Sequence, residues 1–262
     1  FYSIIIDIII IIIIIFARDY KHRYNKMTEL PKILHKRDSY IDRIKPYMRT
    51  PIIKVMVGHR RVGKSFILYQ LIDLIMKEED GANVIYINKE DIKFEAITSF
   101  KELYDYIDKR LVYDRMNYIF IDEIQEIEDF KKAIRSLALD NNNDIYITGS
   151  NSEMFSGDLA NELGGRYVEF RIYSLSYMEF LNFHGLPNDD ESLEKYTHFG
   201  GLPYLIHLPF NEAVLMEYIS SIYSTIVLRD VVARKNIRNT AFLEQLIRFL
   251  ANNVGSLFSS KS

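Results

Sequence analysis

Short apolar runs alternate with longer amphipathic segments between residues 50 and 172. Apolar runs of this length predict buried strands, and apolar residues three or four positions apart predict helices. The predicted strands are Ile52–Val57, Val84–Ile87, Tyr118–Ile121, Asp144–Thr148 and Val168–Ile172, and the predicted helices are Lys64–Lys77, Ser99–Leu111 and Phe130–Leu139. This alternation predicts an α/β fold with a doubly wound parallel sheet, whose ligands bind beyond the carboxyl ends of the strands.

The strand pattern stops after Tyr173. The segments that follow have helical spacing, with a break at Gly200–Pro203, and they are Leu175–Phe183, Glu191–Phe199, Glu212–Val232 and Thr240–Asn252. The chain is therefore expected to divide into a helical lead-in (27–50), an α/β core (51–172), a helical region (173–235) and a last segment (236–262).

The first 26 residues do not follow this pattern. Phe1–Phe16 is mostly isoleucine, with eight in a row from Ile8 to Ile15 after Asp7. Three interpretations stay open: an extension outside the fold, which we favour, a membrane anchor over residues 1–17, or a packed element. As a helix the anchor would span about 25 Å of a ~30 Å hydrocarbon core, and Asp7 would be costly there. We expect a cytoplasmic protein that contacts a membrane only if this extension is authentic.

Composition excludes several functions. The 262 residues include no cysteine, which rules out disulfides, thiol nucleophiles and cysteine-ligated metals. The six histidines are scattered without the spacing of a zinc hydrolase. A net charge of −3 does not indicate a strongly basic nucleic-acid binder, although a local basic patch stays compatible with it.

Residues 58–65 read GHRRVGKS, which fits the phosphate-loop pattern G-x-x-x-x-G-K-[ST] in its required context between a strand and a helix. Glycines let the backbone amides approach phosphate, and the start of the helix directs further N–H groups at it. Lys64 is expected to reach the β- and γ-phosphates, and Ser65 to hold Mg²⁺. The expected nucleotide contacts are Gly58, His59, Arg60, Arg61, Val62, Gly63, Lys64, Ser65 and Phe66. His59, Arg60 and Arg61 have less weight, and solvated loop charges are at least as good an interpretation of the two arginines.

Two acidic residues, Asp122 and Glu123, follow the apolar strand Tyr118–Ile121. Beside a phosphate loop this is the arrangement that a Mg²⁺ site needs, so Asp122 is expected to hold the ion and Glu123 to activate water as a general base. One further strand, Val84–Ile87, lies between the phosphate loop and this strand in the sequence. The chain has no Asn-Lys-x-Asp motif, which would bind guanine. These features favour an ATPase with an additional catalytic glutamate over a GTPase.

Further polar residues follow the later strands. Ser150, and with less weight Asn151, could bond the γ-phosphate or its water, or could belong to an ordinary turn. Arg166 could stabilise charge in the transition state, in its own subunit or in a neighbour, or could pair with a carboxylate. Arg229 and Arg234 are weaker candidates because alternating helix charges are usually solvated.

The segments GHRRVGKSF, IFIDEIQEI, the GSN…GGR…YSLSYMEF block, GGLPYLI and LRDVVARKNIRN follow one another over residues 27–262. In this the chain resembles the uncharacterised prokaryotic AAA-like ATPases that carry a C-terminal domain of unknown function numbered 4143. The resemblance implies that Lys64, Ser65, Asp122 and Glu123 take the roles given above and that Arg166 aligns with the family's Gly-Arg. It also implies that residues 236–262 begin a winged-helix-like segment, within which this chain ends.

We therefore expect Mg²⁺-dependent ATP binding and hydrolysis, with nucleotide state coupled to a protein partner or to DNA. The alternative is a slow or non-hydrolysing ATP-dependent switch that regulates a partner through its C-terminal part. The DNA hypothesis rests on family analogy alone. A homo-oligomer is compatible with the sequence, and a small-molecule kinase has little support because no substrate-site signature is present.

Overall fold

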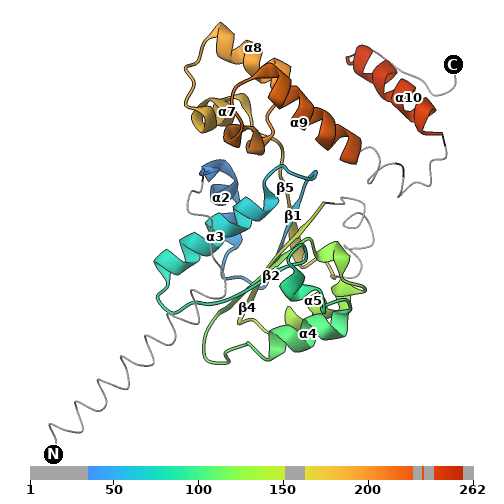
Figure 1. Cartoon of the computed structure of the whole chain (residues 1–262). Helices are drawn as coiled ribbons and strands as arrows, with labels where there is room; N and C mark the ends of the chain where they lie inside the picture. The colour runs from blue at the N-terminus through green and yellow to red at the C-terminus, as the bar shows by residue number, and fades with distance from the viewer. Residues whose placement is uncertain (1–34, 151–162, 227–231, 233–238, 256–262) are drawn as a thin grey trace, which may run out of the picture. The chain divides into compact units, whose positions relative to one another are not determined.

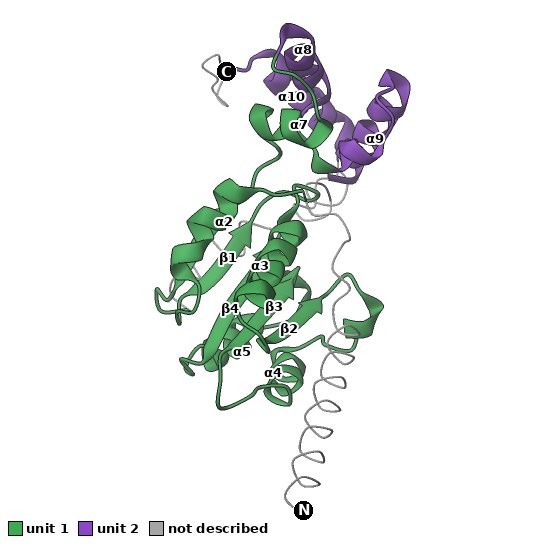
Figure 2. Ribbon diagram, turned by 90° about the vertical axis from the view of Figure 1, so that its left-hand side faces the viewer, with its two compact units in different colours: residues 1–188, 201–203 green, residues 189–200, 204–262 purple. Residues whose placement is uncertain are grey.

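The computed structural model describes residues 35–150, 163–226, 232 and 239–255 (Figure 1). These form two compact units (Figure 2). The first comprises the described residues up to Asn188 together with Gly201–Pro203, and the second comprises those of 189–200 and from Tyr204 onward. Each unit is described by itself below.

The first unit is built on a five-stranded parallel sheet. Its strands are β1 (Ile53–Val57), β2 (Asn83–Asn88), β3 (Asn117–Asp122), β4 (Asn143–Gly149) and β5 (Tyr167–Arg171), in the order β2-β3-β4-β1-β5. Every neighbouring pair is parallel. This confirms the expected α/β fold with a parallel sheet. Because β4 lies between β1 and β3, its end faces the gap between the phosphate loop and the acidic residues.

Helices cover both faces of the sheet (Figure 1). Helices α2 (Asp38–Ile44) and α3 (Lys64–Glu78) pack on one face, and α4 (Phe100–Asp108) and α5 (Phe130–Leu137) on the other. Successive strand residues point to opposite faces, so Val55 and Val57 join the core under α4 and α5 while Met56 joins the core under α3. Short 3-10 helices at Lys45–Tyr47 (η1), Ile92–Phe94 (η2) and Ile124–Glu126 (η3) complete this part.

Helix α7 (Tyr177–His184) belongs to the first unit, although the sequence placed it in the helical region that begins at residue 173. Its start has a capping box: the Ser176 hydroxyl accepts from the backbone N–H of Glu179, and the Glu179 carboxylate accepts from the N–H of Ser176. Buried Phe180 and Leu181 anchor the helix. Local packing thus extends the first unit beyond the last strand.

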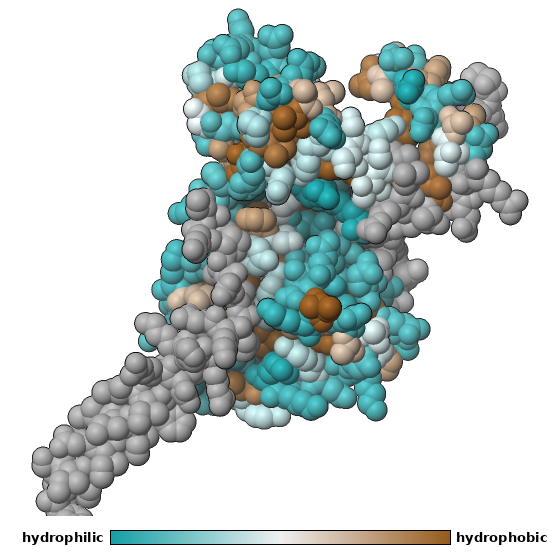
Figure 3. All heavy atoms as spheres, viewed as in Figure 1, coloured by the Kyte–Doolittle hydropathy of each residue, from teal (hydrophilic) through white to brown (hydrophobic). Residues whose placement is uncertain are grey.

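The second unit is helical. It contains α8 (Asp190–Phe199), α9 (Glu212–Thr225) and α10 (Thr240–Asn252), and the 3-10 helix η5 spans Pro203–His207. Helix α9 ends earlier than the expected Val232, and residues 227–231 lie outside the described part. Helix α10 exposes Phe242, Phe249 and Leu250, and hydrophobic side chains lie on its surface in Figure 3. Since α10 is the element described within 236–262, the winged-helix segment stays a prediction.

Among the described residues, no helix combines the length and hydropathy needed to cross a membrane. The isoleucine-rich segment 1–26 lies outside the described residues, so its three interpretations stay untested.

A fully buried ion pair joins two central strands at their amino ends. The Lys54 ammonium of β1 bonds the Asp144 carboxylate of β4 and the carbonyl oxygen of Thr50. Asp144 also accepts from the Arg49 backbone N–H at 2.7 Å and from the Tyr146 hydroxyl at 2.8 Å. Burial lowers the pKa of Lys54, and the charge of Asp144 opposes that shift. The buried pair is therefore stable only because each of its two charged groups has further hydrogen-bond partners.

Replacement of Asp144 by alanine is expected to lower the free energy of unfolding by about 3–5 kcal/mol, because it leaves a buried ammonium without its counter-charge. Urea denaturation would measure the change. The double variant Lys54→Met/Asp144→Leu removes both charges and should be more stable than Asp144→Ala. A single variant within about 1 kcal/mol of the original would show that the buried pair is not needed.

Candidate active site

The phosphate loop occupies residues 58–63, between the end of β1 and the start of α3. Gly58 packs against the end of β5, where a Cβ atom would stand 2.3 Å from the carbonyl oxygen of Ile172. Gly63 has φ +95° directly before α3, a left-handed conformation that favours glycine. Close packing and backbone geometry thus require the two motif glycines, in addition to the phosphate access inferred from the sequence.

Lys64 is nearly excluded from solvent and lies inside its own loop. Its ammonium donates to the carbonyl oxygens of Gly58 and His59, each at 3.1 Å, and lies 3.3 Å from Oε1 of Glu123. The side chain thus joins the loop to the residue after β3. These three oxygens satisfy its charge.

Asp122 ends β3 beside Ser65 and Thr148. Its Oδ1 accepts from the Thr148 hydroxyl, its Oδ2 accepts from the Tyr86 hydroxyl at 3.3 Å, and it has a hydrogen bond with Ser65. Burial raises the pKa of the Asp122 carboxyl, and the hydrogen bonds from Ser65 and Thr148 oppose that increase. The Ser65 hydroxyl and the Asp122 carboxylate therefore lie together at the start of α3. Both groups can supply oxygen ligands to a metal ion.

Glu123 has a left-handed backbone (φ 55°), unusual for a non-glycine residue. Its N–H donates to the Thr148 hydroxyl oxygen at 3.0 Å, and its carboxylate accepts from the Gln125 amide. Burial by itself raises the pKa of Glu123, but Lys64, Gln125 and Ser150 outweigh it, so the pKa lies below its usual range. The two neighbouring carboxyls therefore have pKa values shifted in opposite directions.

The remaining predicted loop contacts, apart from Val62, are less enclosed than Lys64. His59 and Arg61 are exposed, Arg60 is half-buried and Val62 is buried. Phe66 is 41% exposed, and its ring packs edge-on against another ring of α3, that of Tyr69. The structure keeps all of these residues at the carboxyl edge of the sheet.

Ser150 follows β4 and is brought to the site, with a hydrogen bond to Glu123 and a 3.4 Å contact from the Gln125 amide. Arg166 is not. It precedes β5, and its carbonyl oxygen accepts from the N–H of Ile53 at the amino end of β1. The loop begins at the other end of that strand, about 13 Å away. The structure therefore does not bring Arg166 to the phosphate loop of its own subunit, and its catalytic role stays a prediction. Asn151, Arg229 and Arg234 lie outside the described residues.

Thr148 and Arg37 were missed by the sequence analysis. Thr148 lies at the end of a predicted strand near the other polar residues, and this position could have indicated its role. Arg37 precedes the loop by more than 20 residues, and its side chain donates to the Val62 carbonyl oxygen at 3.0 Å. No local motif could have predicted this contact.

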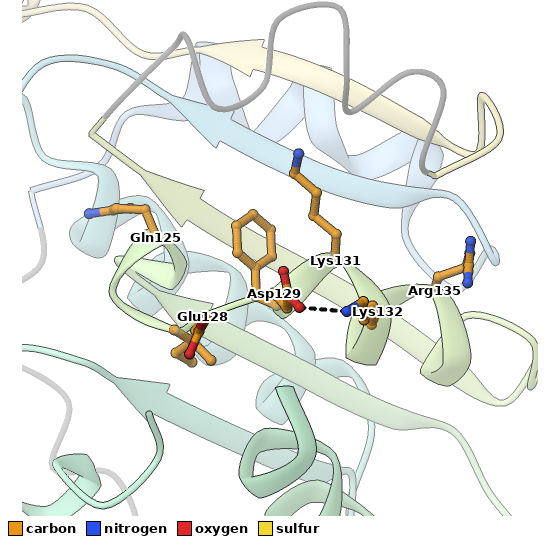
Figure 4. Close-up of a pocket in the computed structure, with 8 residues that line it drawn as sticks. Gln125, Glu128, Asp129, Lys131, Lys132 and Arg135 are labelled. Atoms are coloured by element: carbon orange, nitrogen blue, oxygen red, sulfur yellow. Dashed lines mark hydrogen bonds and ion pairs between the residues drawn. The ribbon is translucent and has the colours of Figure 1, made fainter. Parts of the chain in front are cut away.

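A separate pocket of about 420 Å³ lies at the start of α5 (Figure 4). Its lining comprises Gln125, Ile127, Glu128, Asp129, Phe130, Lys131, Lys132 and Arg135. The Lys132 ammonium is 2.5 Å from the carboxylate of Asp129. Through Gln125 this pocket adjoins Glu123, but it does not include the phosphate loop.

A parallel sheet of this order, with a phosphate loop after β1 and acidic residues after β3, defines a P-loop nucleotide-binding fold. A sequence profile of the AAA domain family matches residues 50–181, half of the chain, and the chain belongs to that family. Residues 190–262 match a profile described as Domain of unknown function (DUF8612). The expected 4143 designation of the C-terminal part is thus not confirmed.

Two curated relatives are uncharacterised proteins. One, from Haemophilus influenzae, is 34% identical over 236 residues, which cover 87% of this chain and 58% of the relative. Another, from Methanocaldococcus jannaschii, is 32% identical over 223 residues, which cover 80% and 48% respectively. The chain spans about half the length of these relatives.

Among solved structures, this chain is similar to Cdc6p from Pyrobaculum aerophilum, with 13% identity and a TM-score of 0.46 over 68% of this chain and 61% of that one. It is also similar to AMPPCP-bound DnaA from Aquifex aeolicus, with 15% identity and a TM-score of 0.43 over 90% and 79%. This degree of similarity assigns no function.

The Thr148 hydroxyl serves both acidic residues, so Thr148→Val is expected to leave the Glu123 N–H and one Asp122 oxygen without their partner. The expected loss in the free energy of unfolding is about 1–3 kcal/mol, measured by urea denaturation. Thr148→Ser keeps the hydroxyl and is the matched control. Equal losses in both variants would contradict the assignment, because they would trace the effect to the methyl group.

Proposed function

We propose that this chain binds ATP with Mg²⁺ and hydrolyses the bond to its γ-phosphate, giving ADP and phosphate. The main support is one arrangement: Lys64 and Ser65 from α3, Asp122 from β3 and Glu123 directly after it surround one phosphate loop. Membership of the AAA domain family supports nucleotide binding in general. Hydrolysis and the role of Mg²⁺ are proposed in addition to nucleotide binding.

The residues present fit Mg²⁺. Within the described residues no three His, Cys, Asp or Glu side chains cluster as a metal cage. Mg²⁺ commonly uses one or two protein oxygens and takes its other ligands from water and phosphate. Ser65 and Asp122 would supply those protein oxygens. When bound, the ion would neutralise charge on the phosphate oxygens.

The low pKa of Glu123 has a consequence for turnover. A carboxylate paired with Lys64 is a weak base, since the ion pair stabilises its charged form. If Lys64 turns to the phosphates of ATP, the carboxylate loses part of that stabilisation and becomes more basic. Glu123 would then accept a proton from the attacking water, and Ser150 would help to orient the groups.

The same contacts favour a second function, a slow ATP-dependent switch. Both Glu123 oxygens are engaged, Oε1 with Lys64 and Oε2 with Gln125. A protein that keeps Glu123 in this state after binding ATP would hydrolyse it slowly. Its partner would then respond to the bound nucleotide.

Helix α10 carries little charge and exposes several apolar side chains. It carries one acidic and one basic residue, Glu244 and Arg248, and exposes Phe242, Phe249 and Leu250. DNA binding depends on clustered positive charge, which this helix lacks. Aromatic side chains such as Phe242 and Phe249 are enriched where proteins contact each other, so we propose a protein partner for this helix, and DNA stays an alternative for the C-terminal part.

Lys64→Ala is expected to abolish detectable ATP binding, whereas Glu123→Gln should keep binding and lower the turnover rate by about 10²–10⁴-fold, the usual contribution of a general base. Isothermal titration with Mg²⁺ and ATP measures binding, and phosphate release measures turnover. If the unsubstituted protein binds ATP but releases no phosphate, its function is that of the switch. Full turnover by Glu123→Gln would refute the general-base role.

We further propose that Arg166 acts on a neighbouring copy in a homo-oligomer. It is exposed, and it follows two glycines with positive φ. The variants Lys64→Ala and Arg166→Ala should then each be inactive alone but partly active when mixed, because a mixed pair restores one intact site. Phosphate release from the mixture measures this. No recovery in a mixture shown to co-assemble would exclude action between subunits.

A further inference from the structure

Arg37 is a buried cation whose partners come from three separate segments. Its Nη1 donates to the carbonyl oxygens of Val62 in the phosphate loop and Tyr173 after β5, each at 3.0 Å. Its Nε and Nη2 bond the two carboxylate oxygens of Glu179 at 2.8 and 3.1 Å, and Nη2 also reaches the carbonyl oxygen of Ser174 at 3.4 Å. One guanidinium thus joins the loop, the segment after β5 and helix α7.

The contact with Val62 bears on phosphate binding. A loop that directs its N–H groups at an anion turns carbonyl oxygens away from it, and a buried carbonyl needs a donor. Val62 is buried and directly precedes Gly63. Arg37 supplies a charged donor to its carbonyl, which is stronger than a neutral one. The contact therefore helps to fix the loop conformation before phosphate arrives.

The position of Arg37 is itself held by α3. Its backbone N–H donates to the side-chain oxygen of Gln70 at 2.9 Å, and the Gln70 amide donates to the carbonyl oxygen of His35 at 3.1 Å. The guanidinium also lies over the ring of Tyr40, 4.5 Å from its centre. The backbone at Arg37 is therefore anchored to the same helix whose start forms the phosphate site, and the guanidinium packs on α2.

Glu179 connects the loop to α7. It occupies the first turn of that helix, where it also closes the capping box with Ser176. Burial raises the pKa of Glu179, but its bonds with Arg37 and Ser176 outweigh this, and the pKa is lowered. A movement of α7 would therefore pull on the carboxylate that orients Arg37.

We propose that Arg37 is a positioning residue of the nucleotide site and that its pair with Glu179 couples helix α7 to the phosphate loop. The inference rests on the proposed ATP binding and adds a route for its regulation. A partner that displaces α7 would weaken nucleotide binding. By linkage, bound nucleotide would hold α7 in place by the same free energy.

The test is a double-mutant cycle on nucleotide affinity. Glu179→Gln and Arg37→Met are each expected to raise the Kd for Mg²⁺ and ATP by about 5- to 150-fold, the range of typical couplings between sites. The double variant should lose no more than Arg37→Met alone, because Glu179 acts through Arg37. The loss should fall on Kd and KM rather than on kcat, and Arg37→Lys should recover part of the affinity.

Ser99→Ala is the matched control, since it removes the equivalent hydroxyl cap from α4 and leaves Arg37, Glu179 and α7 unchanged. It should bind ATP with nearly the original Kd. Circular dichroism and thermal melting verify that each variant folds, and if Arg37→Met does not fold, Glu179→Gln alone decides. Original affinity in Glu179→Gln, or an equal loss in Ser99→Ala, would overturn the coupling. An original protein without ATP affinity would instead refute the proposed function.

Discussion

The Lys64 ammonium is the group around which the site is organised. It is nearly excluded from water, so its charge must be satisfied by protein oxygens. Two carbonyls of its own loop and the Glu123 carboxylate do this. The ion pair brings the phosphate loop and the acidic end of β3 together across β4, and it also lowers the pKa of Glu123. A nucleotide phosphate would compete for the same ammonium and so change both the loop and the carboxylate.

Burial disfavours the charged forms of the titratable groups of this unit, and the partners of each group decide the net shift of its pKa. Asp122 has neutral hydroxyl donors close to it, and desolvation raises its pKa. Glu123 has a cation, and its pKa decreases. Lys54 and Asp144 form a fully buried pair at the amino edge of the sheet, away from the phosphate loop. At the amino edge of the sheet an ion pair thus holds two strands together. At the carboxyl edge the ion pair of Lys64 and Glu123 is one that a bound phosphate would rearrange.

Periodicity located the strands and the helix after the loop to within about two residues, because a buried parallel strand must be apolar on both faces. It failed where a residue's partner is distant. Lys54 lies inside an apolar run, and nothing nearby in the chain shows that Asp144 of another strand satisfies its charge. Arg166 has the residue type and the glycines expected of a catalytic arginine, yet strand direction places it at the opposite edge. Helix α7 has an evident helical pattern, but its membership of the first unit depends on contacts that the pattern does not contain.

The sequence by itself determined the phosphate loop, the acidic strand end and the parallel α/β fold, because each follows from residues that are adjacent or regularly spaced. The tertiary structure alone decided that Thr148 serves both acidic residues, that Arg37 holds the loop, and that Arg166 lies away from its own site. These facts depend on strand order and on side chains that meet from distant segments. Local spacing carries the first kind of information, whereas hydrogen bonds between distant buried groups arise only when the chain has folded.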